Sequence, residues 1–106
     1  MPFEFDFLPS ADADVLQIDA YFRTFANHHA ESFLDALRAT AKFYAQFPLL
    51  GSPVVVTGLP ATDLRWGKVK KYRKYLLIYR PASPAIEIVR VVYGQQNLAA
   101  ALSGDV

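Results

Sequence analysis

Hydrophobic and acidic residues alternate at the start of the chain. Phe3, Phe5 and Phe7 are separated by Glu4 and Asp6. A period of two is typical of a β-strand with one buried face. We therefore expect the chain to begin with a strand.

Two helices are predicted next, because apolar residues then recur at spacings of three and four. The first repeat covers residues 11–25, where Ser10 is a suitable N-cap and acidic residues in the first turn suit the helix dipole. The second covers residues 30–47, and Pro48 and Gly51 end it. A short link at residues 26–29 favours an antiparallel helical hairpin.

The rest of the chain has the pattern of three strands, at residues 64–66, 72–80 and 86–93. Residues 81–84, Pro-Ala-Ser-Pro, suit a hairpin loop between the last two. The predicted fold is α+β, with the order βααβββ and the helical hairpin packed on a small antiparallel sheet. A single domain over residues 1–106 accounts for the whole length.

The two long strands are apolar on both faces, which is typical of strands covered on both sides. If the loop sets the register, one face carries Leu76, Ile78, Val89 and Val91, and the other carries Tyr75, Leu77, Tyr79, Ile86, Ile88 and Arg90. Two helices cover only one face. The other face then requires the C-terminal segment, a second copy or a partner chain.

Composition limits the functional classes. The chain is 53% hydrophobic and 20% charged, so it should fold. It has no cysteine, which excludes disulfides and thiolate chemistry and suits a reducing compartment. No signal peptide is visible, and no apolar run approaches the ~20 residues that cross a bilayer. We expect a cytoplasmic protein without a membrane partner.

Charge is distributed unevenly, although the net charge is only +1. Residues 1–64 have a balance of −5 and residues 65–106 one of +6. Seven of the eleven bases lie within residues 65–80, interleaved with aromatic residues. Such a segment suits nucleic acid, where rings stack on bases, or an acidic protein surface. The alternative is a solvated edge strand that its lysines keep soluble.

Catalytic and metal-binding motifs are weak. His28 and His29 are neighbours, and adjacent helical residues do not share a face, so they form a poor metal pair. Asp12 and Asp14 lie in a predicted first turn, where capping explains them. The histidine pair has no evident route to the basic strand. We therefore expect no cofactor, no metal site and no catalytic residue.

Six segments together resemble the ParE/RelE toxin superfamily, often described as plasmid stabilization proteins. They are Ser10–Ile18, His29–Leu37, Phe47–Gly51, Leu64–Arg65, Tyr75–Arg80 and Ile86–Gly94. The resemblance implies the βααβββ fold and a role as the toxin of a type II toxin–antitoxin pair. It also implies a small antitoxin whose disordered tail folds over the toxin. ParE-type members inhibit DNA gyrase and RelE-type members cut mRNA in the ribosome, and the long helical hairpin looks more like ParE.

One motif departs from the family pattern. The last strand is commonly followed by His-Gly-x-Arg-Asp, where this chain has Tyr-Gly-Gln-Gln-Asn at residues 93–97. Gln96 stands where RelE-like nucleases use an arginine. The resemblance therefore favours a toxin that acts by binding over one that acts as an enzyme. The alternatives are a metal-independent, ribosome-dependent mRNA endonuclease and a non-toxic nucleic-acid-binding or protein-binding relative.

We assign three candidate surfaces. The target-binding basic strand comprises Arg65, Trp66, Lys68, Lys71 and Arg73. The antitoxin-binding sheet face comprises Tyr75, Leu77, Tyr79, Ile88 and Arg90. The C-terminal motif comprises Tyr93, Gln96 and Asn97. Expected partners are a cognate antitoxin and DNA gyrase, or the ribosome and mRNA, with a homodimer or a toxin–antitoxin hetero-oligomer as the assembly.

Overall fold

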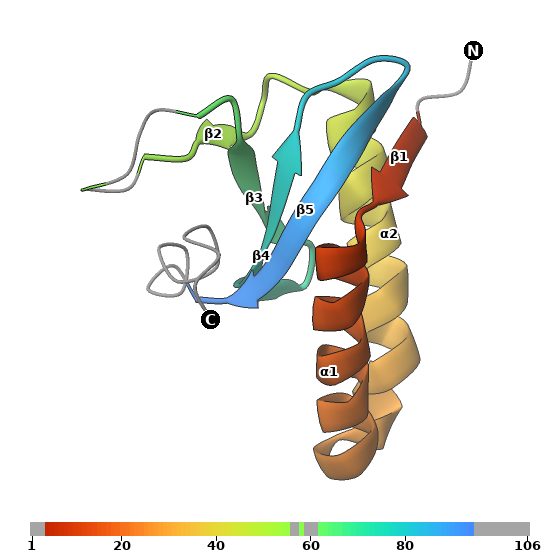
Figure 1. The fold of residues 1–106 in the computed structure, drawn as a ribbon. Helices are drawn as coiled ribbons and strands as arrows, with labels where there is room; N and C mark the ends of the chain where they lie inside the picture. The colour runs from red at the N-terminus through yellow and green to blue at the C-terminus, as the bar shows by residue number, and fades with distance from the viewer. Residues whose placement is uncertain (1–3, 56–57, 59–61, 95–106) are drawn as a thin grey trace.

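The computed structural model describes residues 4–55, 58 and 62–94, and its secondary structure follows the predicted order (Figure 1). Strand β1 (Glu4–Phe7) precedes helices α1 (Pro9–Phe25) and α2 (Ala30–Gln46), which a short 3-10 turn, η1 (Asn27–His29), connects. Strands β3 (Arg65–Val69), β4 (Tyr72–Arg80) and β5 (Ala85–Tyr93) follow. A two-residue strand, β2 (Ser52–Pro53), lies between α2 and β3, where no strand was predicted.

The sheet has the order β1-β5-β4-β3-β2 and is mixed. Three neighbouring pairs are antiparallel, among them the predicted pairs β3–β4 and β4–β5, but β1 runs parallel to β5. The helical hairpin makes this arrangement possible, because it returns the chain to the far side of the sheet before β3 begins. The α+β prediction is confirmed, with the refinement that the first strand is a parallel edge strand.

A β-bulge in β5 changes the predicted faces. Ile78 pairs with Arg90 and Tyr79 with Ile88, so Val89 is an extra residue on its strand. Side-chain alternation reverses beyond a bulge. Val91 consequently shares a face with Leu77, and the prediction that put Val91 with Ile78, and Arg90 with Tyr79, was wrong.

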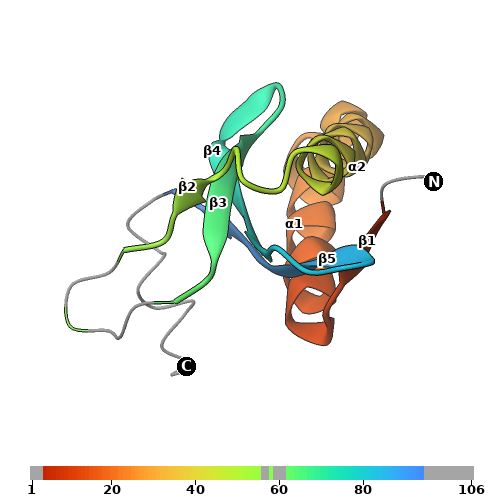
Figure 2. The ribbon, with the colours of Figure 1, turned by 90° about the horizontal axis from the view of Figure 1, so that it is seen from above.

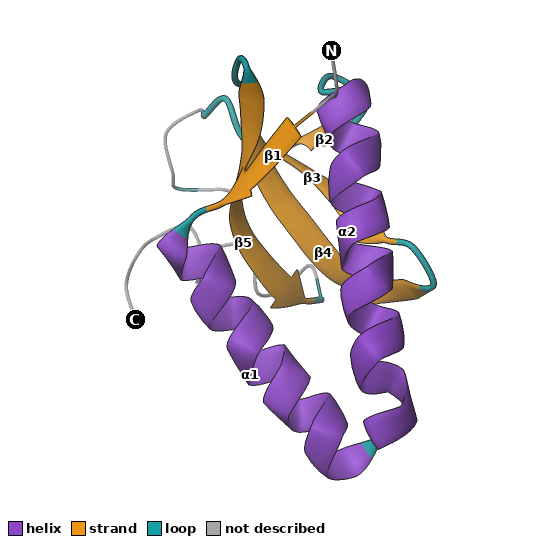
Figure 3. Cartoon of the chain, turned by 90° about the vertical axis from the view of Figure 1, so that its right-hand side faces the viewer, coloured by secondary structure: helices purple, strands orange, loops and turns teal. Residues whose placement is uncertain are grey.

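Both helices lie on the same side of the sheet (Figure 2) and meet in a V whose tip is η1 (Figure 3). The core forms between them and the sheet, from side chains of both helices and of β3, β4 and β5. Leu77, Tyr79 and Ile88 belong to it, with no exposed surface, and Tyr75 packs against it. The face assigned to the antitoxin is thus the one that the helices cover. Leu77, Tyr79 and Ile88 are therefore buried within the monomer, whereas Tyr75 and Arg90 of the assigned face keep some exposed surface.

The opposite face carries a second, smaller core. It consists of Val54, Leu64, Leu76, Ile78 and Val92, with Trp66 and Val89 packed against it. Val54 reaches this cluster because β2 pairs with β3 and Val54 N–H donates to the Leu64 carbonyl at 3.0 Å. The connection after α2 therefore contributes to the packing of the sheet.

Helix α1 begins earlier than predicted and is attached to β5. Pro9 occupies its first turn and Leu8 is the N-cap, so Ser10 does not cap the helix. Ser10 Oγ instead donates to the Val89 carbonyl at 2.7 Å. Asp14 accepts three hydrogen bonds, from Arg90 Nε at 2.7 Å, Arg90 Nη2 at 2.9 Å and Val91 N–H at 2.9 Å. These bonds fix α1 along the edge of β5, where β1 has ended.

No helix in the described part of the chain is long and apolar enough to span a membrane.

Candidate target-binding groove

One threonine of α2 holds the β3–β4 hairpin against that helix. Thr40 Oγ1 donates to the Ala36 carbonyl at 2.8 Å and accepts the Lys70 N–H at 2.9 Å. The hairpin turns at Lys70 and Lys71, and Lys71 has a φ of 71°, in the left-handed region. The turn thereby brings a run of cationic residues beside the C-terminal half of α2.

A groove of about 540 Å³ lies between α2 and this hairpin, and we call it the basic groove. Four cations line it, Lys42 from α2 and Lys68, Lys70 and Arg73 from the hairpin, together with Thr40, Phe43 and Tyr44. A second hollow of about 250 Å³ shares Tyr44, Lys68 and Arg73 with it and adds Leu50 and Trp66. The two hollows are neighbours, because these three residues line both.

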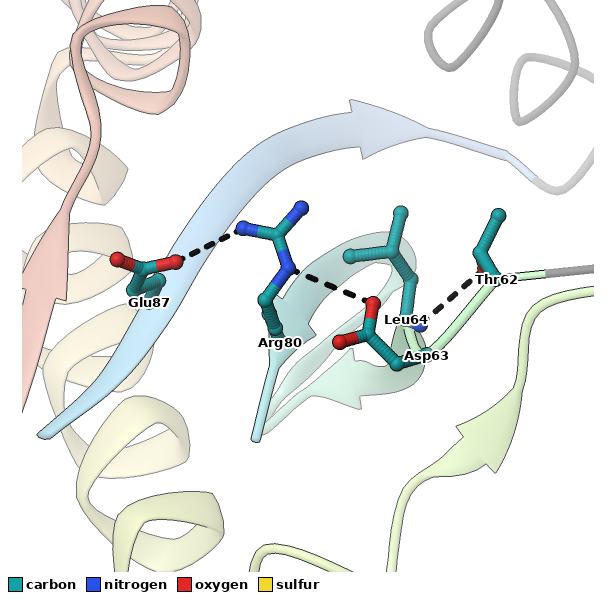
Figure 4. A network of polar contacts seen from close by, with 5 residues as sticks. All are labelled: Thr62, Asp63, Leu64, Arg80 and Glu87. Carbon is teal, nitrogen blue, oxygen red and sulfur yellow. Dashed lines mark hydrogen bonds and ion pairs between the residues drawn. The ribbon is translucent and has the colours of Figure 1, made fainter. Parts of the chain in front are cut away.

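No carboxylate among the described residues neutralises the cations of the basic groove. Across the described residues, no ion pair involves Lys42 or any of the six bases from Arg65 to Lys74. Arg80, the last base of the predicted cluster, differs. It contacts Glu87 Oε1 at 2.8 Å and Asp63 Oδ1 at 3.4 Å (Figure 4). Positive potential is therefore concentrated at the hairpin rather than along all of β4.

Tyr44 forms the floor of the groove and is held from beneath. Its ring stacks on Tyr79 with centroids 5.0 Å apart, and its hydroxyl lies so close to Gly67 that no Cβ would fit there. Burial raises the pKa of the Tyr44 phenol, an effect that Arg73 partly offsets. Tyr44 thus remains neutral near pH 7 and serves as a rigid surface.

Arg65 bonds the backbone of the turn after α2, whereas Trp66 both packs on the second core and lines the second hollow. Arg65 Nη1 donates to the Gly51 carbonyl at 2.7 Å and to the Leu49 carbonyl at 3.2 Å, and so fixes the turn after α2. Of the five residues predicted for target binding, Lys68 and Arg73 line the groove, and Lys71 is exposed at the hairpin tip.

The aromatic residues of the basic segment face inward. Tyr79 is fully buried, and Tyr72 and Tyr75 contact Phe22 and Phe33 with ring centroids 4.9–5.9 Å apart. The interleaved rings therefore do not form the base-stacking platform that the sequence pattern suggested.

His29 contacts the basic strand, contrary to the prediction. Its Nδ1 lies 2.9 Å from the hydroxyl of Tyr72, which donates to Ser32 Oγ at 2.9 Å. This network joins η1, α2 and the start of β4. The described residues contain no cluster of three or more histidines or carboxylates able to hold a metal.

The structure describes only part of the C-terminal motif. Tyr93 is half exposed and packs edge-on against Tyr75, with centroids 5.0 Å apart. Gln96 and Asn97 lie outside the described residues. The sequence reading missed Lys42 and Tyr44, which reach the groove from α2. In the sequence, both residues appear only as members of the second predicted helix, with Lys42 as a polar residue within its apolar repeat.

Comparisons with known proteins agree with this fold. A family model described as the ParE toxin of a type II toxin–antitoxin system, parDE, matches residues 5–98. A solved structure described as the chromosomal ParDE toxin–antitoxin system from P. aeruginosa superposes with a TM-score of 0.69 at 15% identity. The match covers 89% of this chain and 98% of that chain. The comparison with curated proteins gave no match.

The topology, a helical hairpin on one side of a five-stranded mixed sheet, defines a small α+β fold. The chain belongs to the ParE toxin family of type II toxin–antitoxin systems.

Proposed function

We propose that this chain arrests growth by binding a cellular target, with DNA gyrase as the first candidate, and that a cognate antitoxin neutralises it. The basic groove is the observation that carries the proposal. Its four cations, without a paired carboxylate in the described part of the chain, supply a positive surface that steers and holds an acidic partner.

The lining of the groove supports binding over RNA cleavage. Cleavage without a metal needs a proton acceptor and a proton donor beside the phosphate. Among the residues that the structure describes, no histidine or carboxylate lines the groove or the adjoining hollow, and burial raises the pKa of the Tyr44 phenol. The groove therefore offers charge for binding without an evident proton-transfer pair.

Controlled expression tests the proposal. Induction of the chain in a bacterial host should stop growth, co-expression of the cognate antitoxin should restore it, and the purified chain should inhibit gyrase supercoiling. The variant Lys68→Glu/Arg73→Glu should lose both effects. The control Arg38→Glu/Lys74→Glu changes the net charge equally at residues outside the groove and should keep them.

Two results would contradict the proposal. Unimpaired growth on induction of the chain alone would remove the toxin function in that host. Codon-periodic cuts in mRNA, with gyrase unaffected, would favour the RelE-type endonuclease instead.

A further inference from the structure

The basic groove has an apolar rim in addition to its charge. Phe43 and Leu50 line the two hollows and are 44% and 64% exposed. Phe47 packs against Phe43 with centroids 5.3 Å apart, and Leu49 beside Leu50 is 70% exposed. Exposed apolar side chains that adjoin a charged hollow indicate a protein-binding site more than a purely electrostatic one.

Nucleic acid fits this surface poorly. Single strands bind where bases stack on free aromatic faces along a positive track. Here one face of Tyr44 is already stacked on Tyr79, and Trp66 is packed on the second core as well as lining the second hollow. The more exposed rings, Phe43 and Phe47, are tilted by 53° to each other. A phosphodiester backbone has no apolar group to contact the exposed leucines.

An acidic protein segment matches both parts of the surface. Carboxylates would pair with Lys42, Lys68, Lys70 and Arg73, and apolar side chains one helical turn away would contact Phe43 and Leu50. The turn that presents Leu49 and Leu50 is fixed in advance, because Arg65 and Tyr79 bond its backbone. Such preorganisation reduces the entropy that binding would otherwise lose.

We infer that the basic groove docks an acidic segment of the target protein, anchored by leucine or aromatic side chains, and that it does not contact the target's DNA. This inference rests on the proposed function, since it specifies the part of the target that the same groove recognises. It predicts that recognition needs charge and apolar contact together.

Peptide selection on the full-length chain tests the inference without knowledge of the target. Short random peptides displayed on phage should yield a consensus rich in Asp and Glu with Leu, Phe or Trp. The synthetic consensus peptide should shift amide resonances of Thr40–Tyr44 and Lys68–Arg73 in NMR spectra. A selection that yields no acidic and apolar consensus would overturn the inference.

Variants then separate the two kinds of contact. Lys68→Glu/Arg73→Glu should weaken the peptide by about tenfold or more, and Phe43→Ser/Leu50→Ser by about tenfold. Arg38→Glu/Lys74→Glu should change the affinity less than about twofold. A single-stranded oligonucleotide of equal charge should bind more weakly. Tighter binding of that oligonucleotide, lost in the charge variant and kept in the apolar variant, would show a nucleic-acid site instead.

DNA-free gyrase subunits distinguish this inference from the proposed function. Binding of the chain to a subunit without DNA, in competition with the peptide, supports both. If the chain inhibits supercoiling but binds gyrase only when DNA is present, the proposed function stands and the inference is overturned. Peptide binding without any effect on gyrase would retain the inference and reject gyrase as the target.

Discussion

Tyr79 fixes the end of helix α2 to the sheet through one hydroxyl group. The hydroxyl donates to the Pro48 carbonyl at 2.6 Å and accepts the Gly51 N–H at 3.0 Å. A Cβ at residue 51 would clash with this hydroxyl, which its two hydrogen bonds hold in place, so glycine is the residue that fits. One buried phenol therefore determines the identity of the turn residue and the position of the groove rim beside it.

Three tyrosines, Tyr79 among them, give the stability of the fold a pH dependence. Burial raises the pKa of Tyr44, Tyr75 and Tyr79 above their usual value of 10.0. Since the folded state holds these protons more tightly than the unfolded state, their contribution is complete below pH 10.0 and is lost as pH rises through the folded pKa values. We expect the free energy of unfolding, measured in urea, to fall above that pH by up to about 1.4 kcal/mol per pH unit for each tyrosine.

Tyr79→Phe isolates one part of this effect. It should cost about 1–3 kcal/mol at pH 7, because the Gly51 N–H loses its acceptor. It should also reduce the alkaline loss of stability. Tyr21→Phe, which removes a half-exposed phenol, is the control. An unchanged alkaline slope in Tyr79→Phe would show that Tyr79 does not contribute.

At residue 71, the backbone conformation favours glycine over the lysine that is present. Its φ of 71° costs an L-residue about 1 kcal/mol, whereas glycine adopts it freely. We expect Lys71→Gly to raise the free energy of unfolding by about 0.5–1 kcal/mol in urea titrations. Lys70→Gly removes the same charge without this relief and should not stabilise. Equal effects of the two variants would assign the gain to charge instead.

At the scale of the elements, Asp14 connects α1 to β5. Its carboxylate is 12% exposed and bonds both Arg90 and the Val91 N–H. We expect Asp14→Ala to cost about 2–4 kcal/mol of unfolding free energy, because charge-assisted bonds in a partly buried site are lost. Thermal or urea unfolding measures this loss.

Asp12→Ala is the matched control for Asp14→Ala. Asp12 is an exposed residue of the first turn of the same helix, so its loss should cost less than about 1 kcal/mol. Similar losses in the two variants would show that Asp14 acts only on the helix dipole and not through β5.

Local patterns predicted the elements but not the contacts between them. The period of two at residues 3–7 and the helical spacings were sufficient for β1, α1 and α2, since these signals come from near neighbours. The bulge at Val89 has no such signal, and it alone reassigns Val91 to the helix side. The groove joins Lys42 to Lys68, Lys70 and Arg73, and only the packing of α2 on the hairpin brings them together.

At the scale of the whole molecule, the basic groove gathers like charges that repel one another. Such sites commonly reduce stability in exchange for function. We expect Lys68→Gln/Arg73→Gln to raise the free energy of unfolding by about 0.5–1 kcal/mol at low salt while toxicity falls. Arg38→Gln/Lys74→Gln provides the comparison.

Ionic strength provides a second check on that repulsion. The stability gain should shrink at high salt, because exposed charges are screened there. A gain that persists in high salt would point to packing rather than charge.

The contact between α1 and β5 also limits how a partner can extend the sheet. Beyond Ile88, the Val89 carbonyl is taken by Ser10 and the Val91 N–H by Asp14. An incoming strand would find these ladder positions occupied by side chains of the chain itself. A partner strand therefore cannot pair with this part of β5. The same two bonds from α1 also protect the monomer from edge-to-edge aggregation. A partner strand could join only elsewhere, for example along the outer edge of β1.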